Sequence, residues 1–244
     1  MPSRPEIGLL ELGTVPYGQA LALQHRLRAR LIDGEGSPRL AGWLLVLEHP
    51  PVVTLGKRGE IGALVQPEQL RAQGVECFEI DRGGEATAHE PGQLVIYPVV
   101  DLEALDLGVV DVVRGLAAEL SDALGTFGVE AAYDPDHPGI WTQGEPSHKL
   151  ASVGMRVRRG TTTHGAALNL VNDLSTFSMI VPCGMPQAPM ARLADLVDAE
   201  EDSIQPLSFA RRVYPGLESL LGAKLRDADV ELPTADDWAE PINY

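Results

Sequence analysis

Residues 149–169 read KLASVGMRVRRGTTTHGAALN and have the pattern of a β-hairpin. Apolar residues alternate along 153–157, an arginine-glycine pair at 159–160 breaks the run, and the even-numbered residues of 164–170 share a second face. Alternation with period two on both sides of a glycine turn is typical of two antiparallel strands. We therefore predict a hairpin with Lys149 at its entrance.

The rest of the chain mixes helical and strand patterns without strict alternation. Helical spacing covers about 17–31 and 108–127, and about 207–221 with a disturbance at Tyr214-Pro215, whereas strand patterns cover 43–47 and 94–99. Pro98 places the second of these strands at an edge or a bulge, because proline cannot donate to a ladder. Cys77 is expected to be a small apolar core residue. These patterns favour an α+β fold with a largely antiparallel mixed sheet flanked by helices.

Composition indicates one domain and excludes several classes of function. The 244 residues are 44% hydrophobic, and no linker or repeat divides them, so we expect a domain at 1–224 and an acidic tail at 225–244 that is weakly ordered or draped over the surface. The net charge of −16 opposes binding to nucleic acid or anionic membrane. No segment reads as a signal peptide or a membrane span, which predicts a soluble cytoplasmic protein.

The charge is unevenly distributed. Residues 195–244 hold twelve acidic and four basic side chains, whereas 149–159 hold Lys149, Arg156, Arg158 and Arg159 and no acid. Such a basic stripe either suits an acidic partner or anionic substrate group, or is the solvated face of one strand.

Four segments suggest one site with a thiol and a base. They are residues 82–89 (RGGEATAH), 149–154 (KLASVG), 164–169 (HGAALN) and 182–184 (PCG). A cation near Cys183 would lower the pKa of its thiol and make it a nucleophile, and Lys149 is a candidate for that cation. Glycine at 83, 84 and 184 would allow the backbone to approach a ligand closely.

Each residue type also has an ordinary explanation. Lys149 can be a surface lysine, Cys183 a reduced cysteine in a loop, and the glycine pair at 83–84 a simple turn. His89 can be a metal ligand, a base or a packed loop histidine, but no HExxH or CxxC spacing supports zinc. No Rossmann or P-loop fingerprint is present.

Together, the four ordered segments resemble the octanoyltransferases of lipoate biosynthesis. The resemblance covers about 45–196 and is carried by Arg82, Gly83, Gly84, Thr87 and His89, by Pro91 to Leu94, and by the segments around Lys149, His164 and Cys183. It implies a fold like the catalytic domain of biotin and lipoate ligases, which is related to class II synthetases.

The resemblance also implies an activity. Cys183 would take an octanoyl group from octanoyl-acyl carrier protein and pass it to a lysine of apo lipoyl domains, those of 2-oxoacid dehydrogenases and of the glycine cleavage H protein. Lys149 would act as base, and no metal or other cofactor is needed because a thioester is already activated. The substrate-binding residues it implies are Arg82, Gly83, Gly84, Glu85, Ala86, Thr87, Ala88, His89, Ser152, Val153, Gly154, His164, Gly165, Ala166 and Ala167. We expect a monomer.

The chain departs from the family pattern at Ala88, where tyrosine is usual, and at Glu90, where glycine is usual. Loss of the tyrosine ring is expected to open volume near His89, and Glu90 to stiffen its loop or pair with a basic residue. Three other functions remain open: an ATP-dependent lipoate ligase, an octanoyl amidotransferase on the same fold, and a non-catalytic module that binds lipoyl domains or acyl carrier protein.

Overall fold

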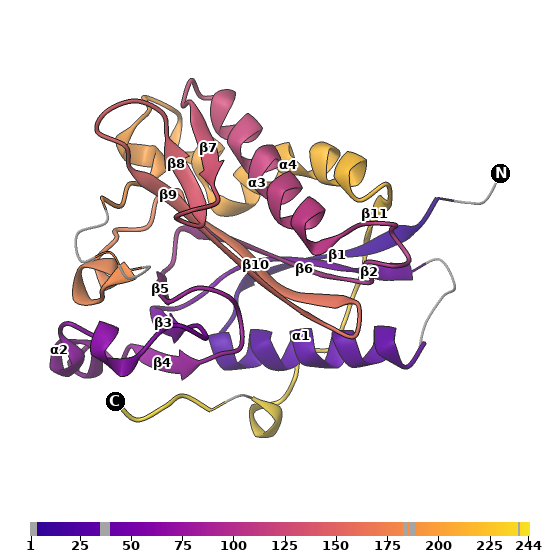
Figure 1. Ribbon diagram of the computed structural model, residues 1–244, viewed down its shortest axis with the longest axis horizontal. Helices are drawn as coiled ribbons and strands as arrows, with labels where there is room; N and C mark the ends of the chain where they lie inside the picture. Colours follow the sequence, from indigo (N-terminus) through magenta and orange to yellow (C-terminus); the bar gives the residue numbers. More distant parts are fainter. Residues whose placement is uncertain (1–3, 35–39, 183–184, 186–188, 239) are drawn as a thin grey trace.

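The computed structural model describes residues 4–34, 40–182, 185, 189–238 and 240–244. Its main element is an eight-stranded sheet crossed by helices on both faces (Figure 1). In spatial order its strands are β11 (Lys224–Asp227), β1 (Glu6–Thr14), β2 (Leu40–Glu48), β6 (Gln93–Val100), β10 (Thr161–Asn169), β9 (Lys149–Arg158), β8 (Gly139–Thr142) and β7 (Ala131–Asp134). Within this sheet, as far as the structure describes the chain, only β1 pairs in parallel, with β11 and β2, so the predicted mixed and largely antiparallel sheet is confirmed.

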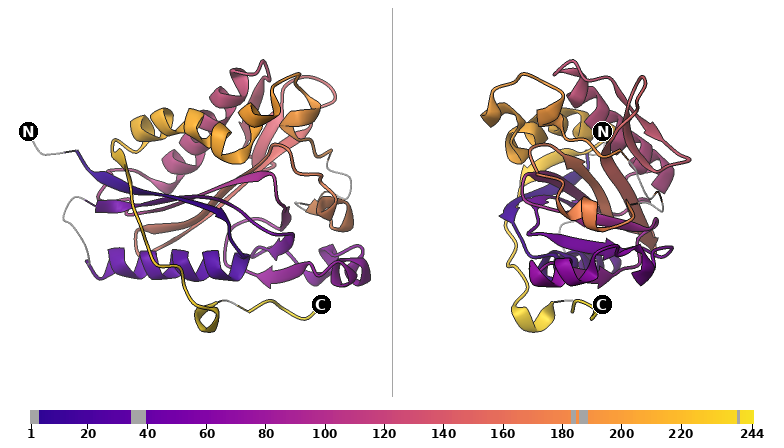
Figure 2. Two further views of the ribbon diagram at one scale, coloured as in Figure 1. Left: turned by 180° about the vertical axis from the view of Figure 1, so that it is seen from behind. Right: turned by 90° about the vertical axis from the view of Figure 1, so that its left-hand side faces the viewer.

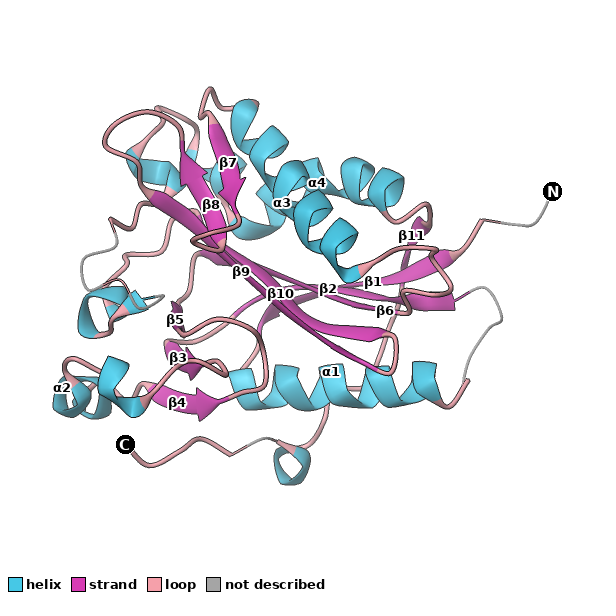
Figure 3. Cartoon of the chain, in the orientation of Figure 1, coloured by secondary structure: helices cyan, strands magenta, loops and turns pink. Residues whose placement is uncertain are grey.

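Helices cover the two faces of this sheet. Helices α3 (Val109–Gly125) and α4 (Pro206–Leu220) lie on one face and α1 (Tyr17–Ile32) on the other, as Figure 3 shows by secondary structure. The alternation along β2 explains both layers, because Leu44 packs toward α3 and α4 while Trp43 and Leu45 pack toward α1. All three predicted helices are present, with boundaries within a few residues of the expected ones.

Helix α4 continues through Pro215 without a break. A proline inside a helix costs about 3 kcal/mol or more through the lost hydrogen bond and the ring clash. Phe209, Val213 and Leu217 on the same helix are fully buried in the core shared with α3. Burying a large apolar side chain contributes about 1.5–3 kcal/mol, so these three contacts outweigh the local cost.

A second sheet of three strands stands beside the first. It consists of β4 (Glu76–Glu79), β3 (Val52–Leu55) and β5 (Ala86–His89), with the short helices η1 (Ile61–Ala63), α2 (Pro67–Ala72) and η2 (Thr176–Met179) nearby. Cys77 is fully buried on β4, which confirms its predicted place in the core, and burial raises the pKa of its thiol to about 12. Strand β5 brings the predicted segment 82–89 next to β9 and β10.

Pro98 does not mark an edge, so the first of the two positions expected for it, an edge or a bulge, is wrong. Strand β6 lies in the middle of the large sheet, between β2 and β10. The β6–β10 ladder stops at Ile96 and Ala166, before the proline. Beyond that point the Thr162 hydroxyl donates to the Pro98 carbonyl (2.7 Å) and accepts the Val100 N–H (3.0 Å). A side chain thus satisfies backbone groups on either side of the gap that the proline leaves in the ladder.

The chain after β11 crosses the α1 face and reaches the small sheet, as seen from behind in Figure 2. Ala228, Val230 and Leu232 pack against the core under α1. The Ile242 N–H donates to the Cys77 carbonyl (2.7 Å), and the Tyr244 hydroxyl donates to the Val75 carbonyl. The chain after β11 therefore connects the α1 face of the large sheet to the small sheet.

Candidate functional site

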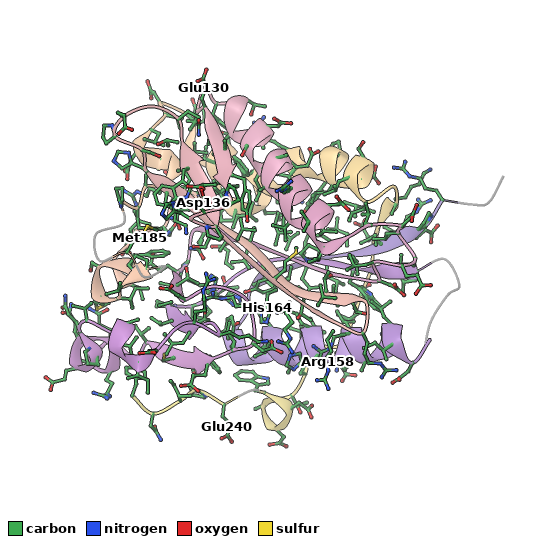
Figure 4. All side chains as sticks on the ribbon, in the orientation of Figure 1. Glu130, Asp136, Arg158, His164, Met185 and Glu240 are labelled. Atoms are coloured by element: carbon green, nitrogen blue, oxygen red, sulfur yellow. The ribbon has the colours of Figure 1, made fainter. Side chains whose placement is uncertain are left out.

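A cavity of about 130 Å³ lies where the two sheets meet. Its walls come from α1, β5, β6, β9, β10 and the loop after β7, and Figure 4 labels two of the lining residues, Asp136 and His164. The lining residues are Tyr17, Arg58, Arg82, Gly83, Gly84, Glu85, Ala86, Thr87, His89, Tyr97, Asp136, His137, Pro138, Ser152, Val153, Gly154, His164, Gly165, Ala166 and Ala167. The fold therefore brings three of the four predicted segments to one cavity.

Ala88 is the one predicted binding residue that does not line the cavity. It is fully buried and packs into the core of the small sheet, because successive side chains of a strand point to opposite faces. A larger side chain at position 88 would therefore point away from His89. Tyr17 of α1 stacks on the His89 ring at a centroid distance of 5.9 Å.

The glycine loop at 82–84 is held against β9. Arg82 donates through Nη2 to the carbonyl and hydroxyl of Thr54 (3.0 and 2.9 Å). Gly84 has a φ of +92°, which favours glycine. A Cβ on Gly154 would lie 3.0 Å from the Gly83 carbonyl oxygen, so the loop and strand approach closely only because the strand also carries glycine.

Two contacts join the remaining walls. The Thr87 and Ser152 hydroxyls lie 3.1 Å apart and connect β5 to β9. A Cβ on Gly165 would lie 2.0 Å from the Ile96 carbonyl oxygen, which requires glycine where β10 crosses β6. Backbone and methyl groups of these small residues form part of the lining, beside aromatic and charged side chains such as Tyr17, Arg82 and His164.

Two buried histidines, His49 and His89, lie beside each other at the site. The Nδ1 of His49 donates to the Val15 carbonyl (2.7 Å), so its Nε2 accepts from the Tyr97 hydroxyl (2.9 Å). Burial lowers the pKa of His49 to about 4. His89 is also held neutral, because burial lowers its pKa well below the usual value. Rings of this kind act as neutral hydrogen-bonding groups at pH 7.

The tautomer of His89 follows from its neighbour. Gln93 donates its side-chain amide N–H groups to the Asn169 side-chain oxygen Oδ1 (2.9 Å) and to the Ala88 backbone carbonyl (3.3 Å). Its Oε1 therefore faces His89 Nδ1 at 2.8 Å as an acceptor, and Nδ1 carries the proton. Nε2 is the nitrogen of His89 that remains as an acceptor.

His164 is oriented by a carboxylate that sequence reasoning missed. Its Nε2 lies 3.2 Å from Asp81 Oδ1, and Asp81 Oδ2 lies 2.9 Å from Arg156 Nε. The hydrogen bond from His164 lowers the pKa of Asp81 to about 2, and burial lowers the pKa of His164. The backbone at His164 has a φ of 61°, and its N–H donates to Gln24 Oε1 (2.7 Å).

Lys149 lies inside the protein and is fully buried. Its Nζ donates to the carbonyl of Pro138, a cavity residue, at 2.9 Å and lies 5.5 Å from the Trp141 ring. A Cβ on Gly139 would lie 2.5 Å from Lys149 Cε. The lysine side chain therefore has room only because β8 carries a glycine at this position. The reading of this residue as a surface lysine is wrong.

The basic stripe is therefore not one solvated face. Lys149 is buried and Arg156 pairs with Asp81, while Arg158 and Arg159 are exposed at the far end of the hairpin. The stripe divides because alternate residues of β9 face opposite sides and the strand runs from the interior to the surface.

Cys183 and Gly184 lie outside the described residues. The chain on either side is held in place: the Val181 N–H donates to the Ala63 carbonyl (2.7 Å), and the Lys149 N–H donates to the Pro189 carbonyl (2.8 Å). The returning chain at 189–191 thus pairs alongside Lys149 at the start of β9.

Several site residues carried no signal that sequence reasoning could use. Tyr17, His49, Asp81 and Tyr97 reach the site from separate elements, and only Asp81 adjoins a predicted motif. Within the described ranges, no group of three or more His, Cys, Asp or Glu side chains could hold a metal ion. Among the helices of the described residues, none has the length and apolar character needed to cross a bilayer.

Comparison with known proteins identifies the family. Residues 16–214 match the model of the lipoyl protein ligase A/B catalytic domain. An octanoyltransferase of Geobacter sulfurreducens is 44% identical over 76% of this chain and 74% of its own length, and one of Corynebacterium efficiens is 42% identical over 95% and 88%.

The chain belongs to the octanoyltransferase family. The predicted family, enzyme class and transfer of an octanoyl group are therefore confirmed. The octanoyltransferase fold is also that of a lipoate-protein ligase A solved with ATP, with a TM-score of 0.72 at 19% identity, covering 95% of this chain and 91% of the ligase. A bipartite lipoate protein ligase from Thermoplasma acidophilum gives 0.69 at 18% identity, covering 96% and 89%. These two similarities show the fold alone.

Proposed function

We propose that this octanoyltransferase moves the octanoyl group from octanoyl-acyl carrier protein to a lysine of apo lipoyl domains by way of an acyl-Cys183 thioester. The acceptors would be the lipoyl domains of 2-oxoacid dehydrogenases and the glycine cleavage H protein, and the enzyme would work as a monomer in the cytoplasm. The main support for this mechanism is the position of Lys149. Its buried Nζ donates to the carbonyl of cavity residue Pro138, and its backbone pairs with the chain that returns from Cys183 at 189–191.

The proposed chemistry balances with one thiol and one amine. The Cys183 thiolate attacks the thioester carbonyl, the bond from carbon to the phosphopantetheine sulfur breaks, and Lys149 gives its proton to the departing thiolate. The amine of Lys149 then takes a proton from the attacking lysine of the acceptor as the amide forms, and the Cys183 thiolate is released. This cycle needs neither ATP nor a metal.

The cavity would hold the acyl chain during both steps. Arg82 to Thr87, His89, Ser152 to Gly154 and His164 to Ala167 surround it, and its small residues leave room for a chain. His164 would be held in orientation by Asp81, through the 3.2 Å contact. An acyl group fixed in this way reacts faster because its carbonyl is already oriented.

The test is the intact mass of the protein after incubation with octanoyl-acyl carrier protein. We expect a hydroxylamine-labile octanoyl adduct that maps to Cys183 and is discharged onto an apo lipoyl domain. Cys183→Ala should give no adduct, whereas Cys77→Ala, which removes the buried cysteine, should still give one.

Lys149→Met should lower transfer by orders of magnitude while the protein stays folded, since methionine reproduces the lysine side chain as far as Cε and lacks only the charged nitrogen. Lys57→Met, at an exposed lysine, is the matched control. Full transfer by Cys183→Ala or Lys149→Met would overturn the mechanism. Transfer from free octanoate that requires ATP would indicate a ligase, transfer from an octanoylated lipoyl domain an amidotransferase, and binding without transfer a non-catalytic module.

A further inference from the structure

Glu90 is a buried carboxylate bonded entirely to neutral donors. It directly follows cavity residue His89 and is 2% exposed. Its Oε2 accepts from the Leu174 N–H and the Asn172 side-chain amide, both at 3.0 Å, and its Oε1 accepts from the Thr176 N–H at 2.6 Å. Within the described part of the chain it forms no ion pair, so the expected pairing with a basic residue is not seen.

These donors lie at the start of the segment that leads to Cys183. Leu174 has a φ of 65°, a conformation that a leucine rarely adopts, and its N–H is one of the groups that Glu90 holds. Helix η2 follows directly. Ile180 then forms an antiparallel β-bridge with Leu64, and the Val181 N–H donates to the Ala63 carbonyl. The carboxylate therefore stabilises a turn from which the remainder of the segment extends.

The other end of this segment, at Ala191, is connected to Glu90 through the side chains of Asn172 and Asn169. Asn172 also donates to Asn169 Oδ1 (3.2 Å), and Asn169 donates through Nδ2 to the Ala191 carbonyl (3.1 Å). The Ala191 N–H in turn donates to the Lys149 carbonyl (3.0 Å). Glu90, Asn169 and Asn172 are each at most 2% exposed, so these bonds are shielded from water.

We propose that Glu90 is a positioning residue for the segment that carries Cys183: it fixes the turn at 172–176 directly and, through Asn172 and Asn169, the chain at Ala191. The proposal rests on the proposed function. It assigns Glu90 no contact with substrate, because the carboxylate faces the turn at 172–176.

A carboxylate suits this place because it only accepts hydrogen bonds. Two backbone N–H groups, one amide and, at 3.5 Å, the Ser175 hydroxyl point at it, and each of these bonds is buried or half-buried. Glutamine has nearly the same shape but would direct an NH₂ group at one of these donors, leaving donors unpaired. The turn would then loosen without loss of volume in the core, and a small displacement of a nucleophile is enough to slow its reaction.

The experiment compares Glu90→Gln with Asp173→Asn in the full-length protein. Asp173 lies in the same turn and accepts the Ser175 N–H (2.8 Å) but is exposed, so it is a matched carboxylate. We expect single-turnover acylation of Cys183 at saturating octanoyl-acyl carrier protein to fall by about tenfold or more in Glu90→Gln, with an unchanged half-saturating donor concentration. Asp173→Asn should match the wild type.

Amide hydrogen exchange provides a second readout that does not depend on activity. In Glu90→Gln, the amides of Leu174, Thr176 and Ala191 should exchange faster while those of β9 and β10 stay protected. A general destabilisation of the fold would instead speed exchange in all of these elements. If Glu90→Gln does not fold, Asn172→Ala replaces it, because it removes one donor and leaves the carboxylate. Its acylation rate and its exchange rates should change in the same direction, but by less.

Wild-type acylation and exchange rates in folded Glu90→Gln would overturn the proposal. Failure of the proposed function would be distinguishable, because the wild type itself would then form no Cys183 adduct. In that case the exchange rates at 172–191 would still decide whether Glu90 anchors the segment.

Discussion

At the scale of single residues, burial decides which side chains can do chemistry. Lys149 reaches its place because Gly139 leaves room on the neighbouring strand, and its ammonium is bonded to a carbonyl at the cavity. His49, His89 and His164 are buried with lowered pKa values, so they are neutral near pH 7. Each of these properties can be tested with one substitution.

Gly139→Ala should displace Lys149. The new Cβ would lie 2.5 Å from both Lys149 Cε and the Ala151 carbonyl oxygen. Overpacking of this kind costs about 1–3 kcal/mol of unfolding free energy, and we expect octanoyl transfer to fall with it. Gly62→Ala, where no atom lies within 4 Å of the new Cβ, should leave both unchanged. Urea unfolding and transfer assays on the two variants check this, and equal behaviour would contradict it.

The buried His49 should make the protein less stable in mild acid. The unfolded chain binds a proton at about pH 6.5, whereas the folded chain resists it until about pH 4. The free energy of unfolding should therefore fall as the pH drops from 6.5 to 4, by up to about 1.4 kcal/mol per pH unit for this residue.

Urea unfolding at several pH values measures that slope. His49→Gln should reduce it by the contribution of one proton, whatever its effect at pH 7, because glutamine does not titrate. His148→Gln, at a half-buried histidine outside the cavity, is the comparison variant. An unchanged slope in His49→Gln would show that this residue does not govern the acid sensitivity.

At the scale of elements, strand β6 shows how a sheet can contain a central proline. The sequence pattern predicted the strand and its apolar character, but not that β10 would supply Thr162 at the gap. The residue two places beyond it, His164, turns its N–H to Gln24 of α1 instead of to β6. The pattern of a single strand does not predict that a side chain will bond to Pro98, since Thr162 is 64 residues away in the chain.

Thr162→Val should destabilise the protein while Thr163→Val should not. Valine has the shape of threonine but leaves the Val100 N–H and the Pro98 carbonyl without their partner, at about 1–3 kcal/mol for each buried group left unpaired. Thr163 is equally buried, but its hydroxyl has no hydrogen-bond partner among the described residues. Denaturant unfolding of both variants tests this, and similar losses would refute the role of the Thr162 hydroxyl.

At the scale of the whole molecule, the two sheets are joined by contacts distant in sequence. The cavity lies between them, and the chain after β11 links the α1 face of the large sheet to the small sheet. Arg71 of α2 stacks over the Tyr244 ring at 5.0 Å. The small sheet is thus held by its contacts with the large sheet at the cavity and by its contacts with the last residues of the chain.

Tyr244→Ala should loosen the small sheet selectively. It removes the ring under Arg71 and the hydrogen bond to Val75, so we expect faster amide exchange at Val75 to Glu79 and an unchanged large sheet. Asn243→Ala, at an exposed neighbour, is the control. Uniform exchange changes across both sheets would show instead that the last residues stabilise the fold as one unit.

Local patterns in the sequence determined the hairpin, the three long helices, the buried Cys77 and the order of the motifs, because side-chain periodicity depends on neighbouring residues. Only the tertiary structure decided that Lys149 is buried, that β6 is central, that Ala88 faces away from the cavity and that Asp81 meets His164. Asp81 and His164 are 83 residues apart, and their contact exists only when two sheets and a helix pack together. Burial and the pKa shifts that follow from it are properties of that packing, and no short segment of the chain contains them.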